Sequence, residues 1–162
     1  LVTYEDAVVL KVPLTNDYQD IKGRLGRITA AGGGDFEEGV DKGLKAALEE
    51  KMDWSAGAKK VLIVIGDAPP RPGDLPATMT LCAEAAGKGW TVNAINVNVA
   101  KQTSEIYAQI AAAGKGTAVD APPGKAGEGS ALVEQMLILS MGQEHEKALA
   151  GFVEILRAIR KR

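Results

Sequence analysis

Two aspartates lie in short glycine-containing segments where carboxylate chemistry could take place. Asp35 closes a run of three glycines that begins at Gly32, and Asp67 stands between Gly66 and the pair Pro69-Pro70. Carboxylates at the C-terminal edge of a parallel sheet can hold a hard cation such as Mg²⁺, which uses one or two protein carboxylates and keeps several waters. The two segments therefore indicate a candidate metal-binding site.

Each aspartate also has a simpler structural interpretation. Asp67 could only organise a turn, because Gly-Asp after a strand is common turn chemistry. Asp35 is a natural helix N-cap, and Glu38 three residues later completes a variant of the capping box. The three glycines could cradle a phosphate, but they match neither the P-loop nor the dinucleotide-binding fingerprint.

The segment before Asp67 predicts how that carboxylate is positioned. Residues Val61 to Ile65 are all apolar and mostly β-branched, which is typical of a strand buried on both faces in a parallel sheet. Strands and helices alternate along the chain, so the predicted fold is α/β, with a doubly wound, mainly parallel sheet. Two short strands around Glu5-Asp6 predict one antiparallel hairpin.

The predicted elements are as follows. Strands are expected at 1–4, 7–12, 60–65, 90–99 and 117–119, and helices near 17–28, 36–48, 78–88, 103–113, 130–140 and 144–160. Asp17 and Thr103 are predicted to cap the helices that follow them. Residues 1–142 are expected to form one domain, and the amphipathic helix within 143–162 is expected to pack on it or extend it.

Composition excludes several functional classes. The formal net charge of −2 provides no basic surface for nucleic acid, and no apolar run is long enough for a membrane span. The single cysteine excludes an internal disulfide framework. The single histidine, His145, lies in a charged stretch with nothing that places it near a nucleophile, so a Ser-His-Asp triad is disfavoured.

Over residues 1–142 the chain resembles a von Willebrand factor A (vWA) domain, in a form similar to the bacterial branch of that family. The features that carry the resemblance are the first hairpin, Pro13–Asp17, Gly32–Val40, Trp54 and Lys60–Pro70. The resemblance implies a Rossmann-like sheet with helices on both faces and a metal-ion-dependent adhesion site (MIDAS) on its upper edge. At that site an acidic side chain of a protein partner commonly completes the coordination of Mg²⁺ or Mn²⁺.

The resemblance assigns a metal role to both aspartates. Asp67 matches the metal-linked aspartate that follows the family's fourth strand. Asp35 falls at or beside a position where many members carry a metal-binding threonine, so it is expected to be either a ligand or a helix cap.

One family motif has no match in this chain. The family's first strand is followed by Asp-x-Ser-x-Ser, which is expected upstream of Leu1. Asp53-Trp54-Ser55 is similar to half of it but precedes a strand, so we reject that match. The strand and motif are expected to belong to a longer form of this chain or to be supplied by a second chain. A member rebuilt without them is the third possibility, and metal binding would then be doubtful.

Three functions remain open at this point. The first is a protein-binding module, assisted by Mg²⁺ or Mn²⁺ at Asp67 and Asp35. The second is a non-catalytic structural component with a vestigial metal site. The third is a Mg²⁺-dependent α/β hydrolase, which is disfavoured because no base and nucleophile pair is apparent. The compartment is open, with the cell envelope or exterior slightly favoured over the cytoplasm.

Overall fold

The structure, a computed structural model, describes residues 1–27, 37–49, 52–98, 100–121, 130–142 and 145–160. The strands are β1 (Val2–Tyr4), β2 (Val8–Lys11), β3 (Val61–Gly66), β4 (Thr91–Asn96) and β5 (Lys115–Asp120). The helices are α1 (Tyr18–Leu25), α2 (Val40–Leu48), α3 (Leu75–Gly87), α4 (Lys101–Ala113), α5 (Ser130–Met141) and α6 (Glu146–Arg160).

Strands β3, β4 and β5 form a parallel sheet in that order. Its register brings the strand ends together, because Gly66 pairs with Asn96 and Asn96 pairs with Asp120. Strands β1 and β2 form a separate antiparallel sheet. The predicted α/β fold, with a mainly parallel sheet and one antiparallel hairpin, is confirmed.

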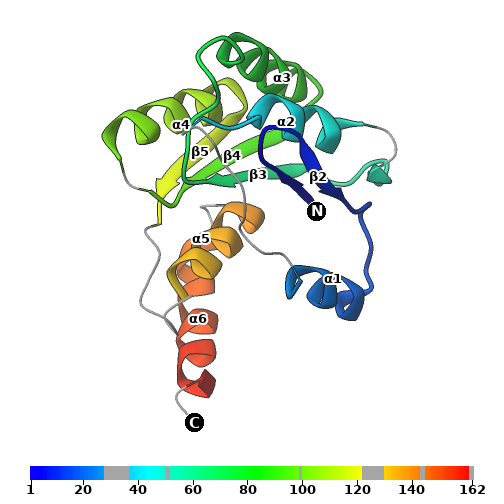
Figure 1. Ribbon diagram of the computed structural model, residues 1–162. Helices are drawn as coiled ribbons and strands as arrows, with labels where there is room; N and C mark the ends of the chain where they lie inside the picture. Colours follow the sequence, from blue (N-terminus) through cyan, green and yellow to red (C-terminus); the bar gives the residue numbers. More distant parts are fainter. Residues whose placement is uncertain (28–36, 50–51, 99, 122–129, 143–144, 161–162) are drawn as a thin grey trace.

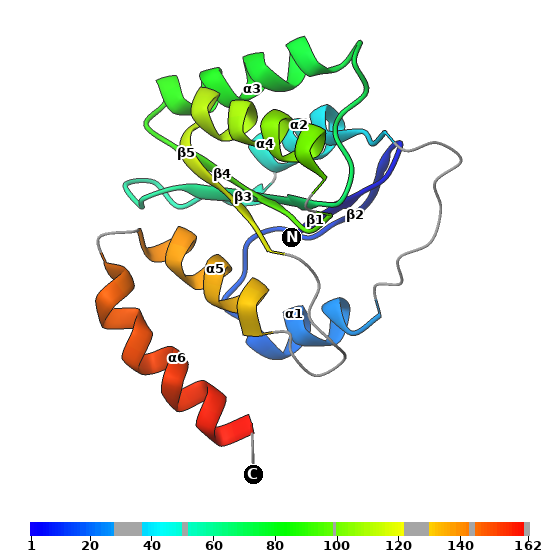
Figure 2. The same cartoon turned by 90° about the vertical axis from the view of Figure 1, so that its left-hand side faces the viewer.

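Helices cover both faces of the parallel sheet, as predicted. Figures 1 and 2 show α2, α3 and α4 on one face and α5 on the other. On the first face a core forms because alternate β3 side chains, Leu62 and Val64, meet apolar side chains of these helices. On the second face Ile63 and Ile65 pack with a smaller cluster that includes Leu139 of α5.

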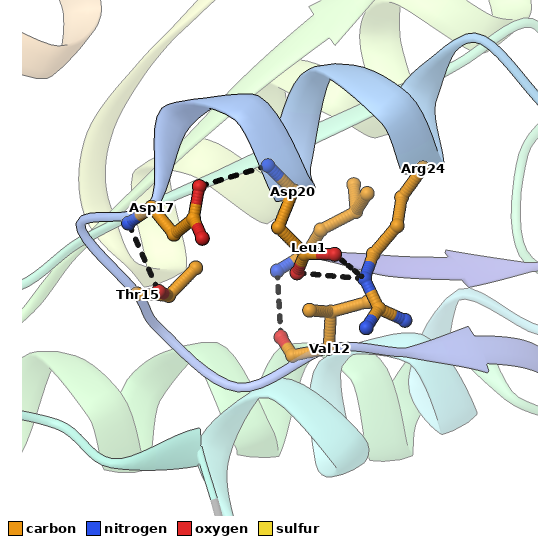
Figure 3. Close-up of polar contacts among 6 residues, drawn as sticks. All are labelled: Leu1, Val12, Thr15, Asp17, Asp20 and Arg24. Carbon is orange, nitrogen blue, oxygen red and sulfur yellow. Dashed lines mark hydrogen bonds and ion pairs between the residues drawn. The ribbon is translucent and has the colours of Figure 1, made fainter.

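The predicted caps of α1 and α4 have different outcomes. Asp17 caps α1 as predicted, because its Oδ1 accepts a hydrogen bond from the Asp20 N–H at 3.0 Å, as Figure 3 shows. The prediction for Thr103 is wrong, since α4 begins at Lys101 with Ala100 as its N-cap. Thr103 is instead buried within the first turn, where its methyl group can pack while its hydroxyl does not cap the helix.

Helix α6 lies beyond the α/β layers. It contacts α5 and extends away from the sheet in both views (Figures 1 and 2). The division of the chain at residue 142 stays a prediction. Within the described parts of the chain, no helix combines the length and apolar character that crossing a bilayer requires.

Candidate functional site

Asp67 lies at the C-terminal edge of the parallel sheet, immediately after β3 ends at Gly66. Its side chain is exposed, while the next residues, Ala68 to Pro70, are buried. The Asp67 carbonyl accepts a hydrogen bond from Asn98 Nδ2 at 2.8 Å. The backbone of Asp67 is therefore held by Asn98, and its carboxylate faces solvent at the place where ligands bind in open α/β sheets.

Two tyrosines explain why a glycine precedes Asp67. A Cβ atom at position 66 would approach the Tyr107 hydroxyl to under 3.0 Å and would lie 3.4 Å from the Tyr4 hydroxyl. Tyr107 is fully buried, and its hydroxyl donates to the Ala68 carbonyl at 3.0 Å. The absence of a side chain at Gly66 thus leaves space for Tyr107 to hydrogen-bond the turn that carries Asp67.

Two carboxylates affect the pKa values of the tyrosines beside the Asp67 turn. Burial raises the pKa of Tyr4 to about 12; the neighbouring Tyr107 hydroxyl acts in the opposite direction, and Glu38 and Asp67 raise it further. Burial, together with Tyr4 and the same two carboxylates, also raises the pKa of Tyr107. Glu38 and Asp67 are therefore close enough to the tyrosines to disfavour a tyrosinate, and both tyrosines remain neutral donors near neutral pH.

A second polar group at the same edge was not predicted from the sequence. Asn96, fully buried at the end of β4, donates through Nδ2 to Ser104 Oγ at 2.9 Å and to Asp120 Oδ1 at 3.1 Å. Ser104 Oγ also donates to Asp120 at 2.9 Å, and Asn96 Oδ1 accepts from the Asn98 N–H at 3.0 Å. This network ties the ends of β4 and β5 to α4 and to the loop that holds Asp67.

The sequence signal for this network is weak but identifiable. A polar residue that ends an apolar strand is a candidate for the sheet edge, and both Asn96 and Asp120 stand in that position. Their contact with each other depends on the parallel register of β4 and β5, which no local pattern specifies.

Asp35 lies outside the described residues, but the segment that follows it reaches the same corner. Glu38 forms a bridge with Pro70, and its N–H donates to the Pro69 carbonyl at 3.0 Å. The predicted start of α2 is wrong: the helix begins at Val40 with Gly39 as its N-cap. Glu38 is extended because it pairs with the Asp67 loop, and the N-cap position of α2 is Gly39. The prediction that Asp35 is a helix cap falls on a residue outside the described part of the chain.

The donor side chains among the described residues determine which divalent cation could bind at this edge of the sheet. Among them, no three His, Cys, Asp or Glu side chains gather into a group that could enclose a metal ion. A closed structural site of the zinc type does not fit this donor set. Mg²⁺ fits better, since an exposed carboxylate such as Asp67 can hold it while waters or an outside ligand complete its octahedron.

Comparisons with known proteins agree with this architecture. A family described as "von Willebrand factor A domain" matches residues 1–121. Among solved structures, the conserved hypothetical protein BatB from Bacteroides thetaiotaomicron is similar with a TM-score of 0.60 and 16% identity, over 87% of this chain and 78% of BatB. At that identity the likeness concerns the fold alone. No curated protein matches the chain.

Proposed function

The chain belongs to the von Willebrand factor A domain family, and we propose that it is a protein-binding module that uses the C-terminal edge of β3, β4 and β5. The observation that carries this proposal is the placement of Asp67. Its carboxylate is exposed at this edge, while its carbonyl is held by Asn98 and its turn by Tyr107. An exposed carboxylate on a fixed backbone is suited to binding, because little order has to be gained when a ligand arrives.

In this proposal Asp67 holds Mg²⁺ or Mn²⁺, with Asp35 as a second ligand. The cation supplies a positive charge and open coordination positions, to which an acidic side chain of the partner can bind. The chain's own residues orient Asp67 and keep the edge negative through Glu38 and Asp120. The partner's carboxylate is attracted only when the cation is present, which makes binding metal-dependent.

Binding of Mn²⁺ alone tests the cation site directly. Electron paramagnetic resonance can measure free Mn²⁺ in a titration of the protein, with Mg²⁺ as competitor. We expect Asp67→Asn to weaken Mn²⁺ binding about tenfold or more, since it removes the charge of a ligand at an exposed site. Glu84→Gln is the matched control, because Glu84 is an exposed acid on α3. Equal Mn²⁺ affinity of wild type and Asp67→Asn would contradict the proposed site.

A displayed peptide library tests the proposed class of partner. Peptides captured in Mg²⁺ and released by EDTA are expected to carry Asp or Glu, and Asp67→Asn is expected not to capture them. Capture that survives EDTA, or that is the same on Asp67→Asn, would contradict metal-assisted recognition of an acidic side chain.

A further inference from the structure

Helix α6 projects from the α/β layers of the protein. In Figures 1 and 2 it follows α5 in the chain and runs away from the sheet. Phe152, near the middle of α6, is 50% exposed, and Met141, the last residue of α5, is 51% exposed. A helix of 15 residues is marginally stable by itself and gains most of its stability when its apolar face is packed. The apolar face of α6 is therefore a candidate interaction surface.

The large apolar residues of α6 follow a regular spacing. Leu149, Phe152, Leu156 and Ile159 recur after three, four and three residues, which places them in one row along the helix. We call these four residues the α6 row. Alternate spacings of three and four are those of the a and d positions along which two helices pack. At the start of the row Leu149 is half-buried, whereas Phe152 is exposed.

Charged residues flank the α6 row differently at its two ends. Glu146 is the first residue of α6 and Arg160 is the last, about 20 Å apart at a rise of ~1.5 Å per residue. If Leu149 is assigned to position a and Phe152 to position d, Glu146 and Arg160 both fall at position e, directly beside the row. The side of the helix next to the row is thus acidic at one end and basic at the other.

This distribution of charge is complementary to itself when two helices run in opposite directions. Position 149 of one copy then lies opposite position 159 of the other, and position 152 lies opposite position 156. The e positions also face each other, so Glu146 of each copy comes beside Arg160 of the other. A parallel pair would place Arg160 beside Arg160, and like charges repel. Apolar spacing and charge therefore both favour an antiparallel pair.

The opposite face of α6 argues against a lipid surface as the occupant of the α6 row. Lys147 and Glu154 are both exposed on that face. A helix that lies on anionic lipid carries mainly basic residues on its polar face, whereas this face has both signs of charge. The basic residues near the end of α6 complement the dipole of the helix. A second copy of α6 matches the row and its flanking charges better than a membrane does.

We propose that the α6 row is a self-association surface, through which two copies of the chain form an antiparallel pair of α6 helices. The two apolar rows form the centre of the pair, and a Glu146–Arg160 ion pair closes each end. One helix per copy is a small interface, so we expect a dissociation constant of roughly 1–100 µM. Neither Asp67 nor a cation takes part, so this inference stands apart from the proposed metal site.

Sedimentation equilibrium of the full chain in EDTA tests the proposal, over a concentration range of roughly 1–300 µM. We expect dimers at the upper end, and Phe152→Asp is expected to weaken them about tenfold or more, because it places a charge in the middle of the row. Gly151→Asp is the matched control, since Gly151 is exposed and nothing lies within 4 Å of its added Cβ. A wild-type chain that stays monomeric, or equal losses in the two variants, would overturn the proposal.

Two charge variants test the antiparallel direction. Glu146→Arg alone and Arg160→Glu alone are each expected to weaken the dimer about fivefold to tenfold, because like charges then meet at both ends of the pair. A mixture of the two variants brings opposite charges together again at both ends. Its mixed dimer is expected to regain the wild-type affinity within about twofold. Full-strength dimers of either variant alone would overturn the antiparallel arrangement.

Flotation with anionic vesicles tests the alternative occupant. Vesicles of phosphatidylserine and phosphatidylcholine are mixed with the full chain in EDTA and recovered by density centrifugation. We expect the protein to remain in the unbound fraction. Recovery of wild type with the vesicles, lost in Phe152→Asp and kept in Gly151→Asp, would assign the α6 row to a membrane surface and overturn self-association.

Discussion

Replacing Gly66 by Ala tests whether Tyr107 holds the turn that carries Asp67. The added Cβ would approach the Tyr107 hydroxyl to under 3.0 Å, whereas the next two atoms, the Tyr4 hydroxyl at 3.4 Å and Tyr107 Cζ at 3.6 Å, would be at ordinary contact distances. The conflict therefore involves one oxygen atom. That oxygen cannot move freely, because Tyr107 is fully buried and its hydroxyl is bonded to Ala68.

The expected cost follows from three contributions. Overpacking in a core costs roughly 1–3 kcal/mol, and the displaced Tyr107 hydroxyl loses a hydrogen bond of about 1 kcal/mol. Replacing a strand glycine by alanine returns roughly 0.5–1 kcal/mol of backbone entropy. We therefore expect Gly66→Ala to lower the free energy of unfolding by about 2 kcal/mol, which for a chain of this size is about 4–8 °C in melting temperature.

Urea unfolding of a double-mutant cycle measures this effect. In a Tyr107→Phe background the conflicting oxygen is absent, so Gly66→Ala should cost about 1–2 kcal/mol less than in the wild type. Gly87→Ala is the matched control: nothing lies within 4 Å of its added Cβ, and alanine is the better helix former in α3. A neutral Gly66→Ala, or strict additivity with Tyr107→Phe, would refute the reasoning.

Three further outcomes are expected. Asn96→Ala should lower the free energy of unfolding by about 2–3 kcal/mol in urea, because it removes three hydrogen bonds, of about 1 kcal/mol each, that the buried Asn96 side chain makes, and a loss below about 0.5 kcal/mol would contradict this. Because the folded pKa of Tyr4, about 12, exceeds the ordinary value near 10, its contribution is intact below pH 10 and is lost as pH rises toward 12. Tyr4→Phe should therefore lose less stability than wild type over that alkaline range in melts at fixed pH, and parallel losses would contradict this. Burial raises the pKa of Cys82 to about 11, so iodoacetamide should alkylate it only on unfolding, as mass spectrometry of native and urea-treated protein can show.

The sheet edge was predictable where a local pattern carried the information. The β-branched run ending in Gly66 placed Asp67 after a buried strand, and Asp17 before α1 was recognisable as a cap from its type alone. The start of α2 was not predictable from its capping pattern. The Glu38 N–H donates to the Pro69 carbonyl, and the Gly39 N–H donates to the Glu5 carbonyl. These tertiary hydrogen bonds override the local helix signal.

Contacts that join distant segments were beyond the sequence pattern. Tyr4 and Tyr107 belong to a hairpin strand and to α4, and they meet only because both lie over Gly66. Asn96 reaches Asp120 only through the parallel register of β4 and β5. The sequence shows that these residues are polar or aromatic, but only the fold determines which of their side chains come into contact.

Asn98 provides a way to disturb Asp67 without touching its carboxylate. The Asn98 side chain is exposed, and its Nδ2 bond to the Asp67 carbonyl, 2.8 Å, restrains the backbone of the proposed ligand. If Asp67 holds a cation, its affinity depends on how well that backbone is positioned, since outer contacts of a metal ligand are worth about tenfold in affinity or more. We therefore expect Asn98→Ala to weaken Mn²⁺ binding about threefold to tenfold while changing the free energy of unfolding by less than about 1 kcal/mol.

The pair of measurements on Asn98→Ala distinguishes positioning from simple destabilisation. A loss of Mn²⁺ affinity that grows with urea in proportion to unfolding would mean that the variant only destabilises the fold. A loss that stays constant below the unfolding transition means that the folded protein holds Asp67 less well. Unchanged Mn²⁺ affinity together with a strong effect of Asp67→Asn would show that the carboxylate binds the cation without help from Asn98, and the restraint on the Asp67 backbone would then serve the turn alone.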